Sequence, residues 1–208
     1  ATSSGANFGT SGIYHTNSTT STTAQLDMRD NIVVNNSTPV GTGLTVAFRR
    51  SAANASLNNY STLSNNNDFY AGTPGPSNLI FNDGTNSDQT LADFKTRVTP
   101  RESASFSENP TFINSTTTPY DLRINTTTPT QIESGGITVA TPIAITSDYD
   151  GDLRNATTPD VGADEFAGVG LDLTPPVISY NALLNTGSTS ARTLSANISD
   201  PAGVPTSG

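Results

Sequence analysis

The chain has 208 residues, a net charge of −9, 33% hydrophobic residues and no cysteine. The excess of Asp and Glu repels the phosphates of nucleic acid, and the absence of cysteine excludes disulfides and thiolate metal sites. No apolar run reaches the roughly 18 residues that a membrane-spanning helix needs, so we expect no membrane insertion. Thr, Asn and Gly dominate the rest, which suits strands joined by polar turns. The composition therefore predicts an all-β protein.

The first strand signal follows a polar lead-in. Residues 1–23 are mainly Ser, Thr, Asn and Gly, and we interpret them as a lead-in or a first coil. Apolar residues then alternate with polar ones at residues 24–28 and again at 32–34, a period of two that predicts β-strands. Because the sequence opens at Ala1 within polar residues and without Met, we expect a mature segment of a longer protein.

The apolar residues that lead each strand candidate recur at nearly even intervals. They are Leu26, Leu44, Leu63 and Ile80, separated by 18, 19 and 17 positions. Such regularity favours the stacked coils of a solenoid, in which each coil buries its apolar face against the next. A β-sandwich whose strands recur every 8 to 12 residues or so would give the same spacing at every second strand. Both interpretations stay open, and the solenoid is favoured.

One helix is expected among the strands. In residues 87–98 three apolar side chains recur at helical spacing, and a proline follows. We expect Ser87 or Asp88 as the N-cap, Asp93 facing Arg97, and the helix lying across an opening of the β structure. Further short strands are expected at residues 104–113, 120–124 and 136–145.

Two motifs in residues 145–166, which we call the closing segment, carry a family resemblance. Asp148 to Arg154 has the form D-x-x-G-x-x-R, and Pro159 to Glu165 reads PDVGADE. Together with the strand order over residues 24–166, these motifs resemble the C-terminal coils of secreted right-handed parallel β-helix proteins of Bacteroidota. The resemblance implies that residues 24–169 form the last coils and the closure of such a β-helix.

The residues after the closing segment resemble a different module. Residues 170–176 end in a Pro-Pro pair and are expected to be a linker, and residues 177–208 resemble the first strands of an immunoglobulin-like bacterial surface module. We expect strands at 177–180 and 193–198. A complete module of this kind needs about 100 residues, so it is incomplete here. Proteins of this type are large cargo of the type IX secretion system, which implies contact with secretion machinery and an extracellular or outer cell-surface location.

The closing segment also contains a candidate calcium site. Asp148, Asp150 and Asp152 alternate around a glycine turn with Asp160 nearby, and carboxylates are the ligands that calcium prefers. The glutamate that ends an EF-hand loop is missing from the corresponding position. The second interpretation is structural: one of the first three aspartates pairs with Arg154 and caps backbone amides in a closing turn. The structural interpretation is favoured, and calcium is the one cofactor that the sequence suggests.

Aromatic residues that suit stacking on sugar rings are few. The chain has no Trp, and most Phe and Tyr residues are in phase with the apolar strand faces. Tyr60, Tyr120 and Tyr149 are the candidates for glycan contact. The sequence therefore predicts at most a weak glycan site.

Catalytic residues are also scarce. Asp27 and Asp30 flank Arg29 and suit a carboxylate pair for polysaccharide cleavage, although such charges more often keep a β surface soluble. The single histidine, His15, lies in the polar lead-in, and no nucleophile elbow accompanies it. We interpret His15 as a surface residue.

These observations predict a non-enzymatic, adhesin-like structural segment of a large secreted or cell-surface protein, with a cell-surface or glycan ligand as its partner. The alternative is a carbohydrate-active β-helix, either a polysaccharide lyase or a glycan-binding module. The two hypotheses differ in one structural expectation. The structural segment has no pocket in which an acid, a base and a cation converge, in particular near Arg29 or Arg49.

Overall fold

The computed structural model describes residues 5–52 and 55–203, which divide into two compact units between Gly170 and Leu171. In this part of the chain strands predominate and one helix is present, so the all-β class is confirmed. The first unit contains β1 (Thr10–His15), β2 (Ile32–Val34), β3 (Thr45–Arg50), β4 (Asp68–Tyr70), β5 (Asn78–Asn82), β6 (Ser87–Asp88), α1 (Leu91–Val98), β7 (Phe112–Asn114) and β8 (Asp121–Ile124). The second unit contains β9 (Val177–Tyr180) and β10 (Ala196–Ser199).

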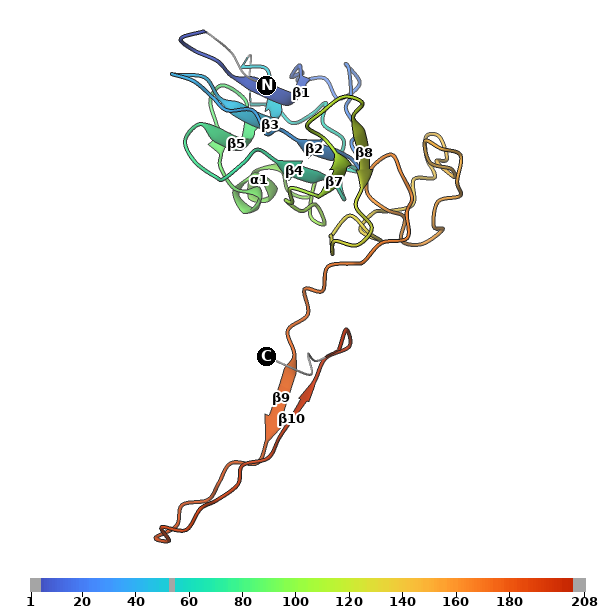
Figure 1. Cartoon of the computed structure of the whole chain (residues 1–208). Coiled ribbons are helices and arrows are strands. Elements are labelled where there is room, and N and C mark those ends of the chain that lie inside the picture. Colours follow the sequence, from blue (N-terminus) through green and yellow to red (C-terminus); the bar gives the residue numbers. More distant parts are fainter. Residues whose placement is uncertain (1–4, 53–54, 204–208) are drawn as a thin grey trace. The chain divides into compact units, whose positions relative to one another are not determined.

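The chain alternates between two parallel sheets. β1, β3 and β5 lie side by side in one sheet, and β2 pairs with β4 in the other (Figure 1). Thr10 pairs with Thr45 and Thr45 with Asn78, at separations of 35 and 33 positions. Successive strands belong to different sheets, so the intervals of 17 to 19 positions in the sequence are half of the structural repeat.

Isolated bridges extend the second sheet in both directions along the chain. Leu26 pairs with Tyr60, and Asp68 pairs with Phe106, both in parallel. Tyr60 is therefore the partner of Leu26, whereas Leu63 is 57% exposed. The expectation that Leu63 leads a buried strand face is wrong, because the chain turns a corner at that point.

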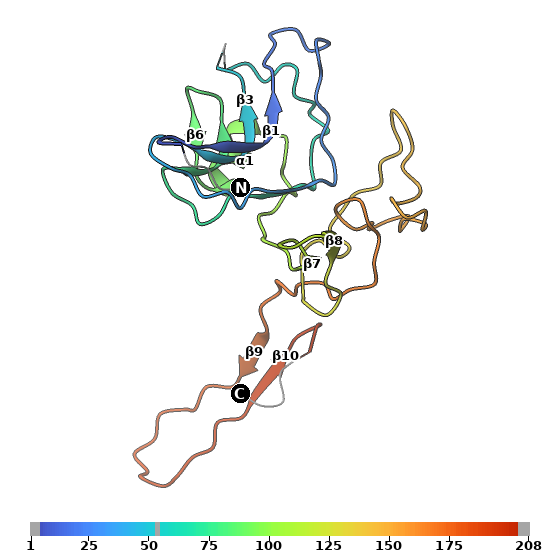
Figure 2. The ribbon, with the colours of Figure 1, turned by 45° about the horizontal axis from the view of Figure 1, so that its top comes forward.

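A cluster of aromatic rings fills the first core, between the two sheets. Phe48 of β3 lies within 5.2 to 6.3 Å, centroid to centroid, of the rings of Tyr60, Phe69, Phe81 and Phe94. All of these side chains are buried. Aromatic pairs in such arrangements each contribute about 0.5 to 1.5 kcal/mol beyond their buried area. Phe94 comes from α1, so the helix completes the core that the strands begin (Figure 2).

The predicted helix is confirmed, but its contacts differ from those expected. Thr90 is the N-cap, because its hydroxyl accepts a hydrogen bond from the Asp93 amide at 3.2 Å. Ser87 and Asp88, the expected N-caps, belong instead to β6, which pairs antiparallel with β5. Arg97 donates two hydrogen bonds of 2.6 Å to Asp88 and none to Asp93. This ion pair fastens the helix to the strand before it.

Short polar side chains form a ladder at the corner between the sheets. The Met28 amide donates to Ser64 Oγ at 3.0 Å, the Asn31 amide to Asn67 Oδ1 at 2.9 Å, and the Asn67 amide to Ser105 Oγ at 2.9 Å. Donor and acceptor are 36 or 38 positions apart in each case. Because buried amides need an acceptor, these side chains replace the backbone partners that a regular strand would offer.

Glu102 is fully buried inside this corner. Its carboxylate accepts hydrogen bonds from the hydroxyls of Tyr60 and Ser105 and, at 2.9 Å, from the side-chain amide of Asn67. Burial raises the pKa of Glu102, and these three donors oppose the rise. The guanidinium of Arg101 lies 5.5 Å from the centre of the Tyr60 ring. The network joins the corner ladder to the first core.

The chain becomes irregular after the corner at Glu102. β7 and β8 form an antiparallel hairpin, but residues 136–145 form no strand. Their amides bond to loop acceptors instead, as the Gly136 amide does to the Pro159 carbonyl at 2.8 Å. The strand expected at 136–145 is therefore wrong.

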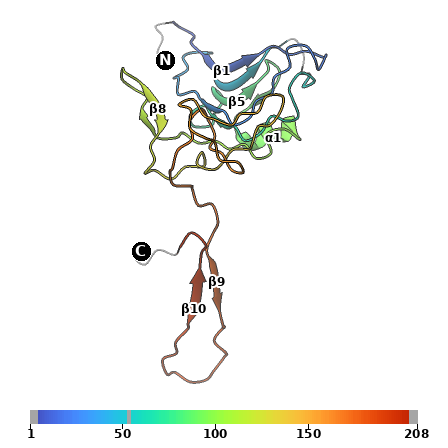
Figure 3. The same ribbon diagram turned by 90° about the vertical axis from the view of Figure 1, so that its right-hand side faces the viewer.

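The second unit is a two-stranded hairpin. β9 and β10 pair antiparallel, from Val177 with Ser199 to Tyr180 with Ala196 (Figure 3). These strands correspond to those expected at 177–180 and 193–198. Every residue of both strands is exposed, and Ile178 is 58% exposed. An isolated hairpin is marginally stable at best in water. The apolar residues on this hairpin therefore lack a packing partner within the described residues.

Asp68 of β4 is a buried carboxyl with one hydrogen-bond partner among the described residues. It is 0% exposed, the Glu108 amide donates to its Oδ1 at 2.8 Å, and no donor reaches its Oδ2. Burial raises the pKa of Asp68 to about 8; the Glu108 amide opposes this and the Glu108 carboxylate adds to it. The protonated form of Asp68 is thus favoured in the folded state at neutral pH.

We predict that the free energy of unfolding decreases as the pH rises from about 5 to about 8. An unfolded Asp titrates near pH 3.9 or so, hence over this range the folded state holds a proton that the unfolded state has lost. In urea unfolding, Asp68→Asn is expected to reduce the loss by about 1 to 3 kcal/mol. Asp121→Asn is the control, because the pKa of Asp121 is lowered by Arg123 and its carboxylate stays ionised in both states. An unchanged loss in Asp68→Asn would contradict this account.

Candidate functional site

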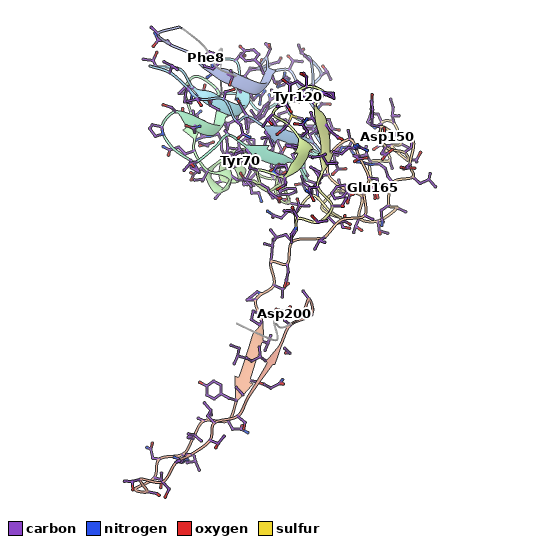
Figure 4. All side chains as sticks on the ribbon, in the orientation of Figure 1. Phe8, Tyr70, Tyr120, Asp150, Glu165 and Asp200 are labelled. Atoms are coloured by element: carbon purple, nitrogen blue, oxygen red, sulfur yellow. The ribbon has the colours of Figure 1, made fainter. Side chains whose placement is uncertain are left out.

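Asp148 organises the turn of the first closing motif. Its Oδ1 accepts hydrogen bonds from the amides of Gly151 and Asp152, both at 2.8 Å, and its Oδ2 accepts from the Glu165 amide at 3.0 Å. The bond from Glu165 and those from the turn lower the pKa of Asp148. Asp150 and Asp152 are exposed on the same turn; Figure 4 labels Asp150. Asp148 therefore caps backbone amides, as the structural interpretation expects.

Asp160 holds the second closing motif in place. It is 1% exposed and accepts hydrogen bonds from the amides of Ser134 at 2.6 Å and Phe166 at 2.7 Å. Burial raises the pKa of Asp160 to about 6; the two amides lower it, and the Glu133 carboxylate raises it further. One carboxylate oxygen thus accepts a hydrogen bond from the backbone of the closing segment, and the other accepts one from the chain before it.

Arg154 connects the two closing motifs. Its guanidinium donates to the carbonyl oxygens of Asp160 at 3.1 Å and Gly162 at 2.7 Å, and its Nη1 lies 3.7 Å from Glu165 Oε2. The expected ion pair of Arg154 with one of the first three aspartates is wrong. Glu165 takes that place because the second motif folds back over the first.

Two of the four candidate calcium ligands, Asp148 and Asp160, belong to different hydrogen-bond systems. Asp148 binds the amides of its own turn and of Glu165, whereas Asp160 binds those of Ser134 and Phe166. Within residues 5–52 and 55–203, no three His, Cys, Asp or Glu side chains are grouped closely enough to hold a metal ion. The structure does not gather Asp148, Asp150, Asp152 and Asp160 into one ligand set, and calcium binding stays a prediction.

The closing segment docks at Asp30, two residues before β2. The Gly162 amide donates to the Asp30 carbonyl at 2.8 Å, and the Ile137 amide donates to Asp30 Oδ1 at 2.9 Å. A second core forms beside this contact. Its residues are Phe106, Ile124, Ile132 and Val161, with Ile32, Phe112 and Phe166 packed against them. Val33 belongs to the first core and Ile32 to the second, so β2 lies between the two cores.

A groove of about 1080 Å³ runs along β2. It is bounded by β1 and β2, by the β7–β8 hairpin, by the loop of residues 137–145 and by the closing segment. Arg29 lies on its border. A pocket thus lies near Arg29, and the expectation concerns whether an acid, a base and a cation converge in it.

Three charged residues, Arg29, Asp30 and Arg154, border the groove. Burial raises the pKa of Asp30 to about 6, against a backbone hydrogen bond and the charges of Arg154 and Arg29. Arg29 donates to both carboxylate oxygens of Asp27, at 2.8 and 3.1 Å, and to the Thr141 carbonyl at 2.6 Å. Arg154 is engaged in the closing segment. An acid and two cations adjoin the groove, but the cations bind protein acceptors and do not converge on Asp30.

The three candidate tyrosines for glycan contact differ in exposure. Tyr60 is 1% exposed and its hydroxyl bonds to Glu102, so its ring is closed to a glycan. The expectation for Tyr60 is wrong because the ring fills the first core. Tyr120 and Tyr149 are 62% and 87% exposed (Figure 4 labels Tyr120), and their contact with a glycan stays a prediction.

The sequence does not single out the apolar residues that border the groove. Leu122, Ile137 and Ile145 are 63%, 44% and 47% exposed, although strand patterns assign them to packed faces. Their apolar character within Thr- and Pro-rich sequence is the one signal that the sequence offers. The groove itself depends on segments that are far apart in the chain.

A comparison of the chain with known protein families, with curated proteins and with solved structures gave no match in any of the three. In the described residues, no helix has the length and apolar character needed to cross a membrane. Function is therefore inferred from the geometry of the chain.

We predict that Gly162→Ala loosens the closing segment more than Gly151→Ala does. Both glycines have positive φ, +106° and +94°, which is unfavourable for alanine by about 1 to 2 kcal/mol. A Cβ at Gly162 would also lie 2.7 Å from Ile32 Cδ1, whereas Gly151 faces open space. Hydrogen exchange at the Val161 amide, which bonds to the Ile132 carbonyl at 3.0 Å, is the measurement. Equal exchange in the two variants would argue against the docking of Gly162 on β2.

Proposed function

We propose that the chain is the end region of a right-handed parallel β-helix and acts as a non-enzymatic, adhesin-like structural segment of a large secreted or cell-surface protein. One observation carries the proposal: parallel partners recur 33 to 38 positions apart through both sheets and the corner ladder. Stacked coils of this kind bury a continuous narrow core and expose long polar faces. Such a structure suits a spacer that presents surface to a partner.

The closing segment supports this proposal as the end of the coil. Its carboxylates bind backbone amides, and its apolar residues cover the outer side of β2. The amides that these carboxylates accept lie in loops that pair with no strand, and buried amides need such partners. We assign the segment the role of a junction between the coil and the module that follows.

The second unit supports a modular protein. Its two antiparallel strands have apolar residues on exposed faces, as expected of the first strands of an immunoglobulin-like sandwich that lacks its other strands. By its resemblance, the parent protein is cargo of the type IX secretion system and contacts that machinery in transit. Its location is then extracellular or on the outer cell surface.

The use of the charged side chains favours a structural role over catalysis. Arg29, Arg97 and Arg154 are each engaged by carboxylates or carbonyls. Asp148 and Asp160 are engaged by amides. Catalytic groups must instead converge on the place where a substrate binds.

A second candidate function rests on the groove. Asp30, whose pKa is raised to about 6, adjoins a cavity of about 1080 Å³. A carboxyl with a raised pKa is suited to act as a general acid. This observation favours a carbohydrate-active β-helix, either a lyase or a glycan-binding module, as the alternative.

Antibodies against the chain are expected to label intact producing cells or to detect the protein in the culture medium. The reason is the proposed export of the parent protein. Treating intact cells with protease should remove the surface label while a cytoplasmic marker persists. Detection only after lysis would refute a surface or secreted location.

The protein is expected to release no unsaturated or reducing products from a panel of polyanionic and neutral glycans. Product release would support the second candidate if it is abolished in Asp30→Asn and retained in Asp164→Asn, whose carboxylate lies outside the groove. Such a result would exclude the non-enzymatic role. Absorbance of unsaturated products and a reducing-sugar assay are the measurements.

A further inference from the structure

β1 and β2 form the same end of the two parallel sheets, and that end is open. Among the described residues β1 pairs in its sheet only with β3, and β2 only with β4. At the other end β6 covers β5, and Phe106 bridges to β4. The unpaired N–H and C=O groups of an edge strand are a template for another strand.

Specific backbone groups of β2 point toward the open edge. The carbonyl of Asn31 and the amide of Asn35 bond to residues of β4, both at 2.8 Å. In a parallel pair every second residue bonds to one neighbouring strand, and the residues between face the other side. The backbone groups of Ile32 and Val34 are therefore directed to the groove that runs along β2.

The corner ladder also has an open position at this end. Asn67 Oδ1 accepts the Asn31 amide, and Ser105 Oγ accepts the Asn67 amide, so each acceptor receives an amide from the preceding coil. Asn31 is equivalent to Asn67, 36 positions earlier. The Oδ1 of Asn31 accepts no hydrogen bond from any residue that the structure describes. An amide from a further coil would complete the ladder.

The groove offers apolar surface on both sides of such a strand. Ile13 and Val33 border it and belong to the first core, whereas Leu122 and Ile137 border it from the hairpin and the following loop. Successive side chains of a strand point to opposite faces. An extended strand beside β2 would cover Ile13 and Val33 with one set of side chains and Leu122 and Ile137 with the other.

We propose that the groove holds an extended strand of the same polypeptide, from a coil one repeat before β2, which pairs in parallel with Ile32 and Val34 and donates an amide to Asn31 Oδ1. The inference rests on the proposed stacked-coil architecture. A second copy of the chain fits less well, because copies with a net charge of −9 repel each other. A glycan lacks the row of backbone groups that pairs with a strand edge.

The chain itself supplies a test strand. In the test chain, a copy of residues 26–35 is joined directly before Ala1. The copied Val34 then lies 11 positions before Thr10 of β1, just as Val34 lies 11 positions before Thr45 of β3. In this extended chain the amides of Ile32 and Val34 are expected to exchange with solvent about tenfold more slowly than in the unextended chain. Unchanged exchange at both amides overturns the proposal.

Two controls separate strand pairing from nonspecific covering. A graft with proline at the copied Val33 and Asn35, whose amides face β2, lacks the donors for pairing, and equal slowing by this graft overturns the proposal. Leu122→Asp in the groove is expected to abolish the slowing, and Leu153→Asp, 83% exposed and outside the groove, is expected to retain it. If both variants retain the slowed exchange, the added strand does not bind in the groove.

Amide exchange in the unextended chain is measured at several protein concentrations as a further test. Slow exchange at Ile32 and Val34 that depends on protein concentration would assign the groove to a second copy and overturn the proposal. The proposed function is tested separately by surface labelling, which does not involve the graft. A failure of the strand proposal is therefore distinguishable from a failure of the proposed function.

Discussion

Parallel pairing between residues 33 to 38 positions apart is the constraint on which the rest of the structure depends. The chain must turn from one sheet to the other at the same place in each repeat, and the amides that leave the sheet at that corner need acceptors. Ser64, Asn67 and Ser105 supply them. The core between the sheets is narrow and is filled by rings around Phe48. A chain with only 33% hydrophobic residues can therefore form ordered sheets, because many of its buried polar groups are hydrogen-bonded.

The same requirement accounts for three of the acidic residues. Asp148 and Asp160 accept amides in the closing segment, and Glu102 accepts three side-chain donors at the corner. A buried carboxylate is unfavourable unless donors surround it, and the raised pKa values of Glu102 and Asp160 reflect that burial. These groups hold the backbone. The edges of β1 and β2 and the groove beside them are not used in this way and remain available to a partner.

Local patterns in the sequence predict local features of the fold well. The helix over residues 91–98 and the capping role of Asp148 follow from spacing and from the turn chemistry of aspartate beside glycine. Position in the stack is harder to predict, because Tyr60 rather than Leu63 is paired with Leu26, and either residue satisfies an apolar pattern. The groove is not predictable from local spacing. Its border joins segments as distant as Arg29 and Thr141, which are 112 positions apart and in contact.

The parallel stack is the central claim, and cross-linking tests it most directly in a chain without cysteine. Tyr14, Arg49 and Asn82 lie in register on β1, β3 and β5. Neighbouring strands are about 4.8 Å apart, and a disulfide joins Cα atoms no more than about 6.8 Å apart. Tyr14→Cys with Arg49→Cys is predicted to form an intramolecular disulfide on mild oxidation, and Tyr14→Cys with Asn82→Cys is predicted not to. No disulfide in the first pair, or equal formation in both pairs, would contradict the parallel stack.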